Sequence, residues 1–221
     1  MASSGIPALD GLLEGGYPDK SSVLVIGQAG IGKEALGYWF IRSGIVQGDY
    51  CLYVSHRTVP DVLRDMKAYG IPQDKVPDWM TSSGSDVKCD ISDYSSISFN
   101  IKQALVRNAG RRARIVTDVV SPLFALNPER SMYDYWSRLL GELKASDSVI
   151  LALAEAGMHS ESTRAALEQQ FDSVIEFVLH EEGLSIIPLL RVRKMVGKQP
   201  MLGYFKISFE KESIMVTPLV K

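Results

Sequence analysis

The sequence has little of the chemistry that marks secreted, membrane-spanning or metal-binding proteins. Its two cysteines, Cys51 and Cys89, are too few for a disulfide framework or a cysteine-based metal site. Its three histidines are scattered and lack metal-ligand spacing. The longest apolar runs, such as residues 149–154, span about six residues, whereas a membrane helix needs about 20. The first ten residues lack the basic and apolar regions of a signal peptide, so we expect a cytoplasmic protein without a membrane segment.

The composition is that of an ordinary globular protein. Of the 221 residues, 46% are hydrophobic and 23% are charged, and the formal net charge is −2, which argues against disorder. The 18 glycines and 10 prolines follow no fixed period, which excludes a collagen-like chain. No internal repeat or long linker divides the sequence, and we expect a single domain over residues 1–221.

Short apolar runs alternate with helical patterns through most of the chain. The patterns predict strands at residues 23–27, 50–55, 113–118, 148–154 and 173–179, and helices at 33–46, 58–69, 94–108, 131–144 and 160–170. Strands that are apolar on both faces and separated by helices indicate a parallel sheet covered on both sides. Strands without intervening helices follow at 184–193, 204–210 and 213–218. The predicted fold class is therefore α/β, a mostly parallel central sheet with helices on both faces and antiparallel strands added at the C-terminal edge.

The strongest functional signal is a glycine-rich segment between the first predicted strand and the first predicted helix. It fits the pattern GxxxxGK and consists of Gly27, Gln28, Ala29, Gly30, Ile31, Gly32, Lys33 and Glu34. Glycines allow several backbone N–H groups to point at one anion, and the N-terminus of the following helix adds partial positive charge. Lys33 would add a point charge between the β- and γ-phosphates of a nucleotide. The segment predicts a phosphate-binding loop, or P-loop.

Two acidic residues are relevant to the binding of a metal ion at this loop. Glu34 stands where a Ser or Thr hydroxyl would hold Mg²⁺, and its carboxylate would either ligate Mg²⁺ or, without a metal, repel the phosphates. The simplest obstruction is an ion pair between Glu34 and Lys33. Asp118 ends the apolar run 114–118, where P-loop proteins place the acid that holds the water shell of Mg²⁺. Alternatively, Asp118 only caps the following turn. We favour the role in metal binding.

Positive charge gathers in residues 102–114, which contain five basic residues and no acid: Lys102, Arg107, Arg111, Arg112 and Arg114. One interpretation is a DNA-binding surface. The other is that the cations stabilise the C-terminus of a helix. Because the whole chain is slightly acidic, we favour the second, and complementary patches on neighbouring subunits explain the cluster equally well.

Several segments together resemble a known family. They are residues 4–18 (SGIPALDGLLEGGYP), 53–55 (YVS), 117–126 (TDVVSPLFAL), 171–175 (FDSVI) and 192–197 (VRKMVG). In this order they are similar to motifs of the KaiC-like branch of the RecA/RadA recombinase ATPases, and the resemblance covers essentially the whole chain. It implies a RecA-like P-loop fold, ATP or ADP with Mg²⁺ as ligands, and a homo-oligomer, often a hexameric ring with nucleotide at each interface.

The hydrolytic parts that the resemblance implies are altered at three places. Glu34 replaces the metal-binding hydroxyl. After residues 53–55 the family carries a Glu pair that activates the attacking water, and here residues 56–58 read HRT. Lys194 matches the lysine that reaches the γ-phosphate across a subunit interface, but Val196 stands in place of the neighbouring arginine. Losing one such electrostatic element typically costs about 10²–10³ in rate, so we expect little hydrolysis.

The sequence thus predicts a degenerate KaiC/RecA-like P-loop protein, a nucleotide-binding or regulatory module with little or no ATP hydrolysis and no assigned catalytic residue. One alternative is a DNA-binding paralogue that uses residues 107–114 or 191–198. Another is an active ATPase in which Glu34 and Asp118 together hold the metal. In that alternative His56 would be the substitute base, since its ordinary pKa is near neutrality.

Overall fold

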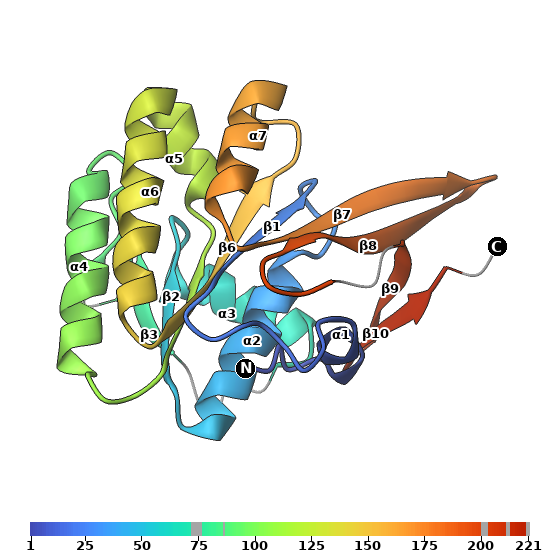
Figure 1. The fold of residues 1–221 in the computed structure, drawn as a ribbon, viewed down its shortest axis with the longest axis horizontal. Helices are drawn as coiled ribbons and strands as arrows, with labels where there is room; N and C mark the ends of the chain where they lie inside the picture. Colours follow the sequence, from blue (N-terminus) through green and yellow to red (C-terminus); the bar gives the residue numbers. More distant parts are fainter. Residues whose placement is uncertain (72–76, 86, 200–202, 211–212, 220–221) are drawn as a thin grey trace.

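A mixed ten-stranded sheet organises the chain (Figure 1). The computed structural model describes residues 1–71, 77–85, 87–199, 203–210 and 213–219. In chain order the strands are β1 (Ser22–Gly27), β2 (Tyr50–Val54), β3 (Asp78–Thr81), β4 (Val87–Lys88), β5 (Ala113–Thr117), β6 (Ser148–Glu155), β7 (Ser173–Glu182), β8 (Ser185–Met195), β9 (Phe205–Glu210) and β10 (Ser213–Pro218). Their order across the sheet is β10-β9-β8-β7-β1-β6-β5-β2-β3-β4.

The sheet divides into a parallel part and an antiparallel part. From β7 through β1, β6, β5, β2 and β3 to β4, every neighbouring pair is parallel. The pairs β7–β8, β8–β9 and β9–β10 are antiparallel. This arrangement confirms the α/β class, the parallel core and the antiparallel C-terminal strands that the sequence predicts.

Helices cover both faces of the sheet and enclose two cores. The helices are α1 (Pro7–Leu12), α2 (Glu34–Gln47), α3 (Val59–Ala68), α4 (Tyr94–Arg107), α5 (Val120–Leu126), α6 (Glu129–Ala145) and α7 (Glu161–Gln170). One core joins α1, α2 and α3 to the sheet and to the C-terminal strands. The other joins α4, α5, α6 and α7 to the opposite face, as Figure 1 shows.

Strand β1 shows why the apolar runs form buried parallel strands. Val23 and Val25 pack in the core beneath α2, whereas Leu24 and Ile26 pack in the core beneath α6. Successive side chains of a strand point to opposite faces, so a strand buried on both sides must be apolar at every position. All six residues of β1 are buried, which places the loop that follows Gly27 at the edge of a rigid core.

Four short elements go beyond the sequence prediction. Strands β3 and β4 extend the parallel sheet past β2, and helices α1 and α5 are single or double turns. Strand β4 has only two residues and β3 begins with Asp78, so neither shows a strand-length apolar run. Short edge strands of this kind are set by pairing with a neighbour and not by their own residues.

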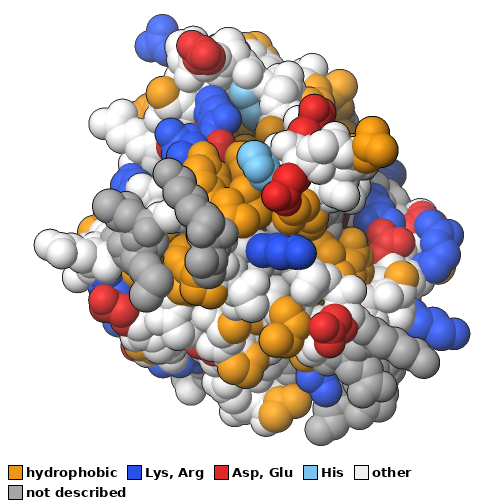
Figure 2. Space-filling model, turned by 90° about the vertical axis from the view of Figure 1, so that its right-hand side faces the viewer, with side chains coloured by type: hydrophobic (Ala, Val, Ile, Leu, Met, Phe, Trp, Pro, Cys, Tyr) orange, Lys and Arg blue, Asp and Glu red, His pale blue; other side chains and the backbone are white. Residues whose placement is uncertain are grey.

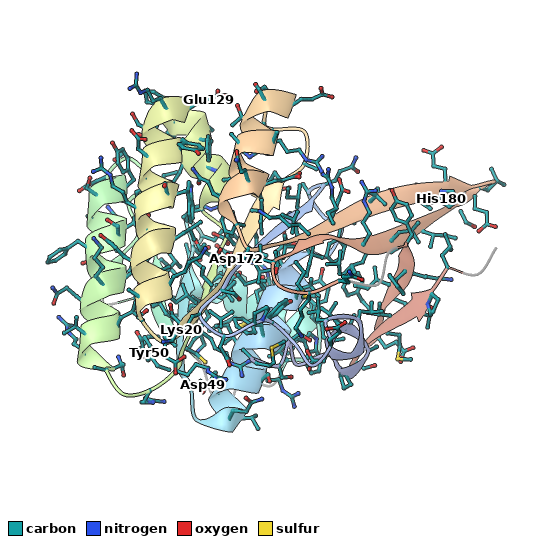
Figure 3. The ribbon with its side chains drawn as sticks, in the orientation of Figure 1. Lys20, Asp49, Tyr50, Glu129, Asp172 and His180 are labelled. Atoms are coloured by element: carbon teal, nitrogen blue, oxygen red, sulfur yellow. The ribbon has the colours of Figure 1, made fainter. Side chains whose placement is uncertain are left out.

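A long hairpin formed by β7 and β8 projects from the sheet (Figure 1). Its outer part is exposed, and Leu184 and Ile186 are among the exposed large hydrophobic residues. Figure 3 shows His180 on this hairpin, far from the helices. Figure 2 views the molecule from the hairpin side and shows hydrophobic side chains gathered near the centre of that face. Within the described residues, no helix has both the length and the apolar character needed to cross a membrane.

Candidate functional site

The carboxyl ends of four adjacent parallel strands bring the candidate residues to one edge of the sheet. Gly27 at the end of β1 lies beside Glu155 at the end of β6. Thr117 at the end of β5 pairs with Ala152 of β6 and with Val54 at the end of β2. The P-loop and the residues that follow β6, β5 and β2 therefore share this edge, which is where ligands bind in open α/β sheets.

The P-loop has the backbone of an anion site. Gly30 and Gly32 have φ angles of +76° and +89°, which favour glycine. The N–H groups of Gly30, Gly32 and Lys33 have no hydrogen-bond partner among the described residues, and no side chain caps α2. A Cβ atom on Gly32 would lie 2.4 Å from the ring of Phe209 on β9, so the loop is also packed from the antiparallel part of the sheet.

Lys33 is buried in a double ion pair. Its side chain is 1% exposed, and its Nζ atom lies 2.8 Å from Glu34 Oε1 and 2.6 Å from Glu155 Oε1. The Glu34 contact confirms the ion pair expected from the sequence. Glu155 adds a second carboxylate from 122 residues away. The ammonium group that a P-loop offers to phosphate is therefore occupied by two acidic side chains of the same chain.

Asp118 follows β5 and lies next to the end of β2. Its Oδ2 atom accepts a hydrogen bond of 2.7 Å from Ser55 Oγ, and its Oδ1 atom lies 3.4 Å from His56 Nδ1. The hydrogen bond with Asp118 raises the pKa of His56, against the lowering effect of burial. His56 is thus tied to Asp118, as an ion-pair partner when protonated.

Arg57 and Thr58 organise the start of α3. Arg57 Nη2 donates to Asp65 Oδ2 at 2.6 Å and to the carbonyl of Asp61 at 3.3 Å. The Thr58 hydroxyl accepts from the N–H of Asp61 and donates to its carboxylate. Arg64 also pairs with Asp61 at 3.0 Å. The first acid after β2 is therefore used to cap a helix.

Two buried tyrosines lie beneath this edge. The rings of Tyr38 on α2 and Tyr53 on β2 are stacked, with centroids 5.9 Å apart. Neither hydroxyl has a hydrogen-bond partner among the described residues. Burial raises the pKa of Tyr38, the nearby charge of Arg57 lowers it, and the acids Asp65, Glu34 and Asp118 raise it. The hydroxyl of Tyr38 is thus within electrostatic reach of both Glu34 and Arg57.

Lys194 has a local structural role in this chain. Its Nζ atom donates to the carbonyls of Glu168, Gln169 and Phe171, at 3.1, 3.1 and 2.6 Å. These carbonyls end helix α7, where a cation is favourable. A contact of Lys194 with a neighbouring subunit would require these bonds to be exchanged. Val196, which stands in place of the family's arginine, is 57% exposed and carries no charge that could contact a phosphate.

Most of the basic cluster is engaged in contacts within the chain. Arg114 is fully buried, with Nε 2.7 Å from Asp49 Oδ2. Arg111 donates to the carbonyls of Gly48 and Asp49, Arg112 pairs with Asp19, and Lys102 pairs with Glu142. These contacts engage four of the five cations within the chain, whereas Arg107 is exposed at the end of α4. They favour the structural interpretation of the cluster over the DNA-binding one.

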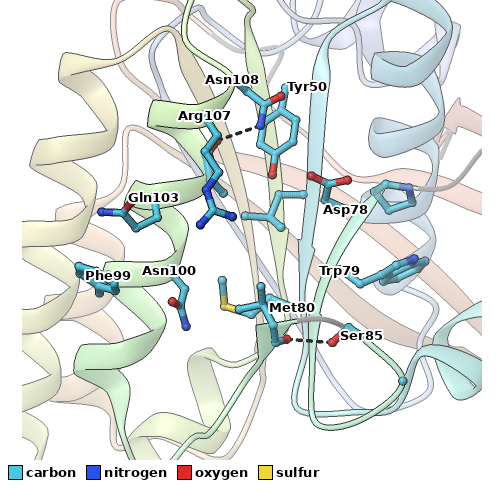
Figure 4. Close-up of a pocket in the computed structure, with 15 residues that line it drawn as sticks. Tyr50, Asp78, Trp79, Met80, Ser85, Phe99, Asn100, Gln103, Arg107 and Asn108 are labelled. Carbon is cyan, nitrogen blue, oxygen red and sulfur yellow. Dashed lines mark hydrogen bonds between the residues drawn. The ribbon is translucent and has the colours of Figure 1, made fainter.

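A hollow of about 620 Å³ lies between α4 and strands β2 and β3. Figure 4 shows Arg107, Asp78 and Tyr50 near one another at one end, with Met80 at the other. Tyr50 and Asp78 begin their strands, and Arg107 ends α4. This end of the hollow therefore lies at the sheet edge opposite to that of the P-loop.

Glu155 is the main site residue that the sequence prediction missed. It directly follows the predicted strand at residues 148–154, and a polar residue at the carboxyl end of a buried parallel strand is a usable signal. Its Oε2 atom is buried and lacks a hydrogen-bond partner among the described residues. Ser55 was also missed as a partner of Asp118.

Comparisons with known proteins agree with this architecture. The family model described as "ATPase: KaiC" matches residues 2–221. A UPF0273 protein of Thermotoga maritima is 25% identical over 97% of this chain and 95% of its own length. The circadian clock protein KaiC2 of Synechocystis is 26% identical over 87% of this chain, which spans only 35% of that protein. The crystal structure of a KaiC-like protein from Pyrococcus horikoshii has a TM-score of 0.78, at 23% identity and 98% coverage of both chains, and it supports the fold.

Proposed function

Because this chain belongs to the KaiC family of P-loop ATPase domains, we propose that it is a nucleotide-binding module that holds ATP or ADP with little or no hydrolysis. The observation that carries the proposal is the P-loop itself. It offers to an anion N–H groups that have no hydrogen-bond partner among the described residues, but the ammonium group of Lys33 is occupied by ion pairs with Glu34 and Glu155. Nucleotide binding then requires the phosphates to displace at least one carboxylate.

The donor set near the loop suits Mg²⁺ in its chemistry. Glu155 Oε2 is a buried carboxylate oxygen without a hydrogen-bond partner among the described residues, and Asp118 Oδ1 is a buried oxygen that lies 3.4 Å from His56 Nδ1. Mg²⁺ prefers such hard oxygen ligands, and when bound with a nucleotide it neutralises phosphate charge. Asp118 would hold the ion, whereas Glu34 would ligate it only in the alternative of a working ATPase. The described part of the chain has no preassembled cluster of three ligands, so the phosphates would have to complete the site.

We expect low hydrolysis because the acidic pair that the family resemblance implies after β2 is absent from this chain. A general base must lie within hydrogen-bond reach of the attacking water. The residues after β2 are Ser55 and His56, which both contact Asp118, and Arg57, which is a cation. Asp61 is held by Thr58 and Arg64. We therefore assign no catalytic residue.

A homo-oligomer, with the hexameric ring that the resemblance implies, is part of this proposal. Lys194 is the interface candidate, and it must exchange its three carbonyl contacts to act there. Light scattering after size-exclusion chromatography, with and without Mg-ATP, measures the assembly directly. A monomer under both conditions would contradict it.

Calorimetric titration with ATP and ADP, each with and without Mg²⁺, tests the binding itself. We expect saturable binding that Lys33→Ala abolishes, with Lys20→Ala as a control that removes an exposed lysine away from the P-loop. Binding of neither nucleotide would refute the proposal. Phosphate release at ordinary rates, abolished by Lys33→Ala, would support instead a working ATPase in which Glu34 and Asp118 hold the metal.

A further inference from the structure

The loop after β2 replaces an acidic position with a cation at the edge of the P-loop site. The backbone N–H of Arg57 donates to Ser55 Oγ at 3.0 Å, and the same hydroxyl donates to Asp118 at 2.7 Å. The backbone of Arg57 is therefore two hydrogen bonds away from the candidate metal-binding carboxylate. This places it beside Asp118 on the side of β2, with the P-loop lying on the other side, beyond β6.

The position of Asp118 indicates where the phosphates of a bound nucleotide would lie relative to Arg57. In P-loop proteins the loop and its lysine bind the β- and γ-phosphates, and the acid after the neighbouring strand holds the ion that bridges them. In that arrangement, a group beyond that acid, on the side away from the loop, would lie toward the terminal phosphate. The charges of Arg57 and of Glu34, at the start of α2, both act on the Tyr38 hydroxyl, so both side chains lie within electrostatic reach of it.

The Arg57 side chain is held in place and still has hydrogen-bond donors to offer. Its Nη2 atom binds Asp65 and the Asp61 carbonyl, whereas its Nε and Nη1 atoms have no partner among the described residues. The side chain is 27% exposed, so it is partly desolvated. A planar guanidinium anchored through one nitrogen is well suited to bind a phosphate with the others.

We infer that Arg57 is an anion clamp for the terminal phosphate, supplied by the same chain, which makes the site selective for a nucleoside triphosphate over a diphosphate. The inference rests on the proposed function and deepens it. At the position where a hydrolytic site needs a base, this chain carries a cation that stabilises the bound phosphate. The protein thereby retains the triphosphate and distinguishes it from the diphosphate.

The test compares affinities for a nonhydrolysable Mg-ATP analogue and for Mg-ADP by calorimetry. We expect the wild-type protein to bind the triphosphate at least about 10-fold more tightly. Loss of one charge-assisted contact predicts that Arg57→Ala weakens triphosphate binding about 10- to 100-fold, with ADP changed less than about threefold. Arg64→Ala is the matched control, because Arg64 is an exposed arginine on α3 that also pairs with an acid. It should change neither affinity.

A second variant separates the clamp from the structural role of Arg57. Arg57→Lys keeps a cation near Asp65 but removes the planar fork, so it should retain the thermal stability and lose part of the triphosphate preference. Equal wild-type affinities for the two nucleotides would overturn the inference and leave the proposed function intact. So would a parallel loss of both affinities in Arg57→Ala with stability preserved. If the wild-type protein binds neither nucleotide, the proposed function fails and the inference fails with it.

Discussion

The double ion pair of Lys33 makes a quantitative prediction about affinity and stability together. Replacing Glu34 by Thr restores a metal-binding hydroxyl and removes one of the two carboxylates that occupy Lys33. A charge-assisted contact is worth about 1.5–3 kcal/mol, which corresponds to about 10- to 150-fold in affinity. Since Glu155 still holds Lys33 at 2.6 Å, we expect Glu34→Thr to tighten Mg-ATP binding by only about 10-fold, the low end of this range.

The double variant Glu34→Thr with Glu155→Gln should show the rest of the effect. We expect a further gain of affinity, but not an additive one, because both carboxylates share Lys33. The protein without nucleotide should be less stable by about 2–4 kcal/mol, since a lysine that is 1% exposed would lose both ion-pair partners. Saturating nucleotide should restore most of that stability, because phosphate then supplies the missing charge.

Urea unfolding with and without Mg-ATP, together with calorimetric titration, measures both quantities. Glu161→Gln is a suitable control, because it removes an exposed carboxylate on α7. Hydrolysis should not return in either variant, since no base is restored. Unchanged or weaker binding by Glu34→Thr would refute the reasoning and would favour a metal-binding role for Glu34. An unchanged stability of the double variant would show that Lys33 does not depend on these carboxylates.

Three further outcomes are expected. Steady-state phosphate release by the wild-type protein should stay far below about 1 s⁻¹, and Lys33→Ala should not lower it further. Gly32→Ala should destabilise the protein by about 1–3 kcal/mol, because residue 32 has a left-handed backbone conformation and its Cβ atom would clash with the Phe209 ring. Urea unfolding measures this loss of stability. Burial raises the pKa of Asp172, but its hydrogen bonds, first that with Lys144, lower it by more, so its net pKa lies below the ordinary value. Its stabilising contribution is thus present above the unfolded pKa and is lost as pH falls through the folded one. Asp172→Asn should lower stability at pH 7 by about 1–2 kcal/mol and flatten its decline in acid.

Each of these outcomes has a control. Phosphate release should be compared with a preparation without the protein, and a rate near 1 s⁻¹ that depends on Lys33 would contradict the first. Gly11→Ala is the control for the second, since a Cβ on Gly11 meets nothing within 4 Å; equal effects at both glycines would contradict the packing argument. For the third, the two proteins should be compared from pH 3 to pH 7, and parallel profiles would show that the pKa of Asp172 is not lowered by folding.

The sequence predicted best those features that depend on neighbouring residues. The strand Ser22–Gly27 and the P-loop carry their signals within a dozen residues, because burial on both faces and an anion-binding turn are local requirements. The ion pair of Lys33 with Glu34 is also local. Glu155 reaches Lys33 only because β1 and β6 are paired, and that pairing is fixed by the whole sheet.

Lys194 shows the limit of motif matching. Its place in the VRKMVG segment predicts a contact with another subunit. In the structure, Lys194 pairs with Val174 across β8 and β7, which sets its side chain beside the end of α7. The register of an antiparallel strand decided its contacts, and no local pattern encodes that register. The short edge strand Val87–Lys88 was not predicted, because its pairing with β3 is also not encoded by a local pattern.

The N-terminal segment and the C-terminal strands pack in the same core, and this affects folding during synthesis. Ile6 and Leu9 lie in the same core as Ile214 and Val216, and Lys198 donates to the carbonyl of Leu13. At about 5–20 residues per second, the first segment emerges from the ribosome about 10–40 s before the strands that cover it. During that interval the segment can pack against α2, as Tyr17 does with Phe40, but the strands that complete its burial are still missing, so part of its apolar surface is available to chaperones. The parallel strands can assemble first, but the final native core forms only when the last hairpin arrives.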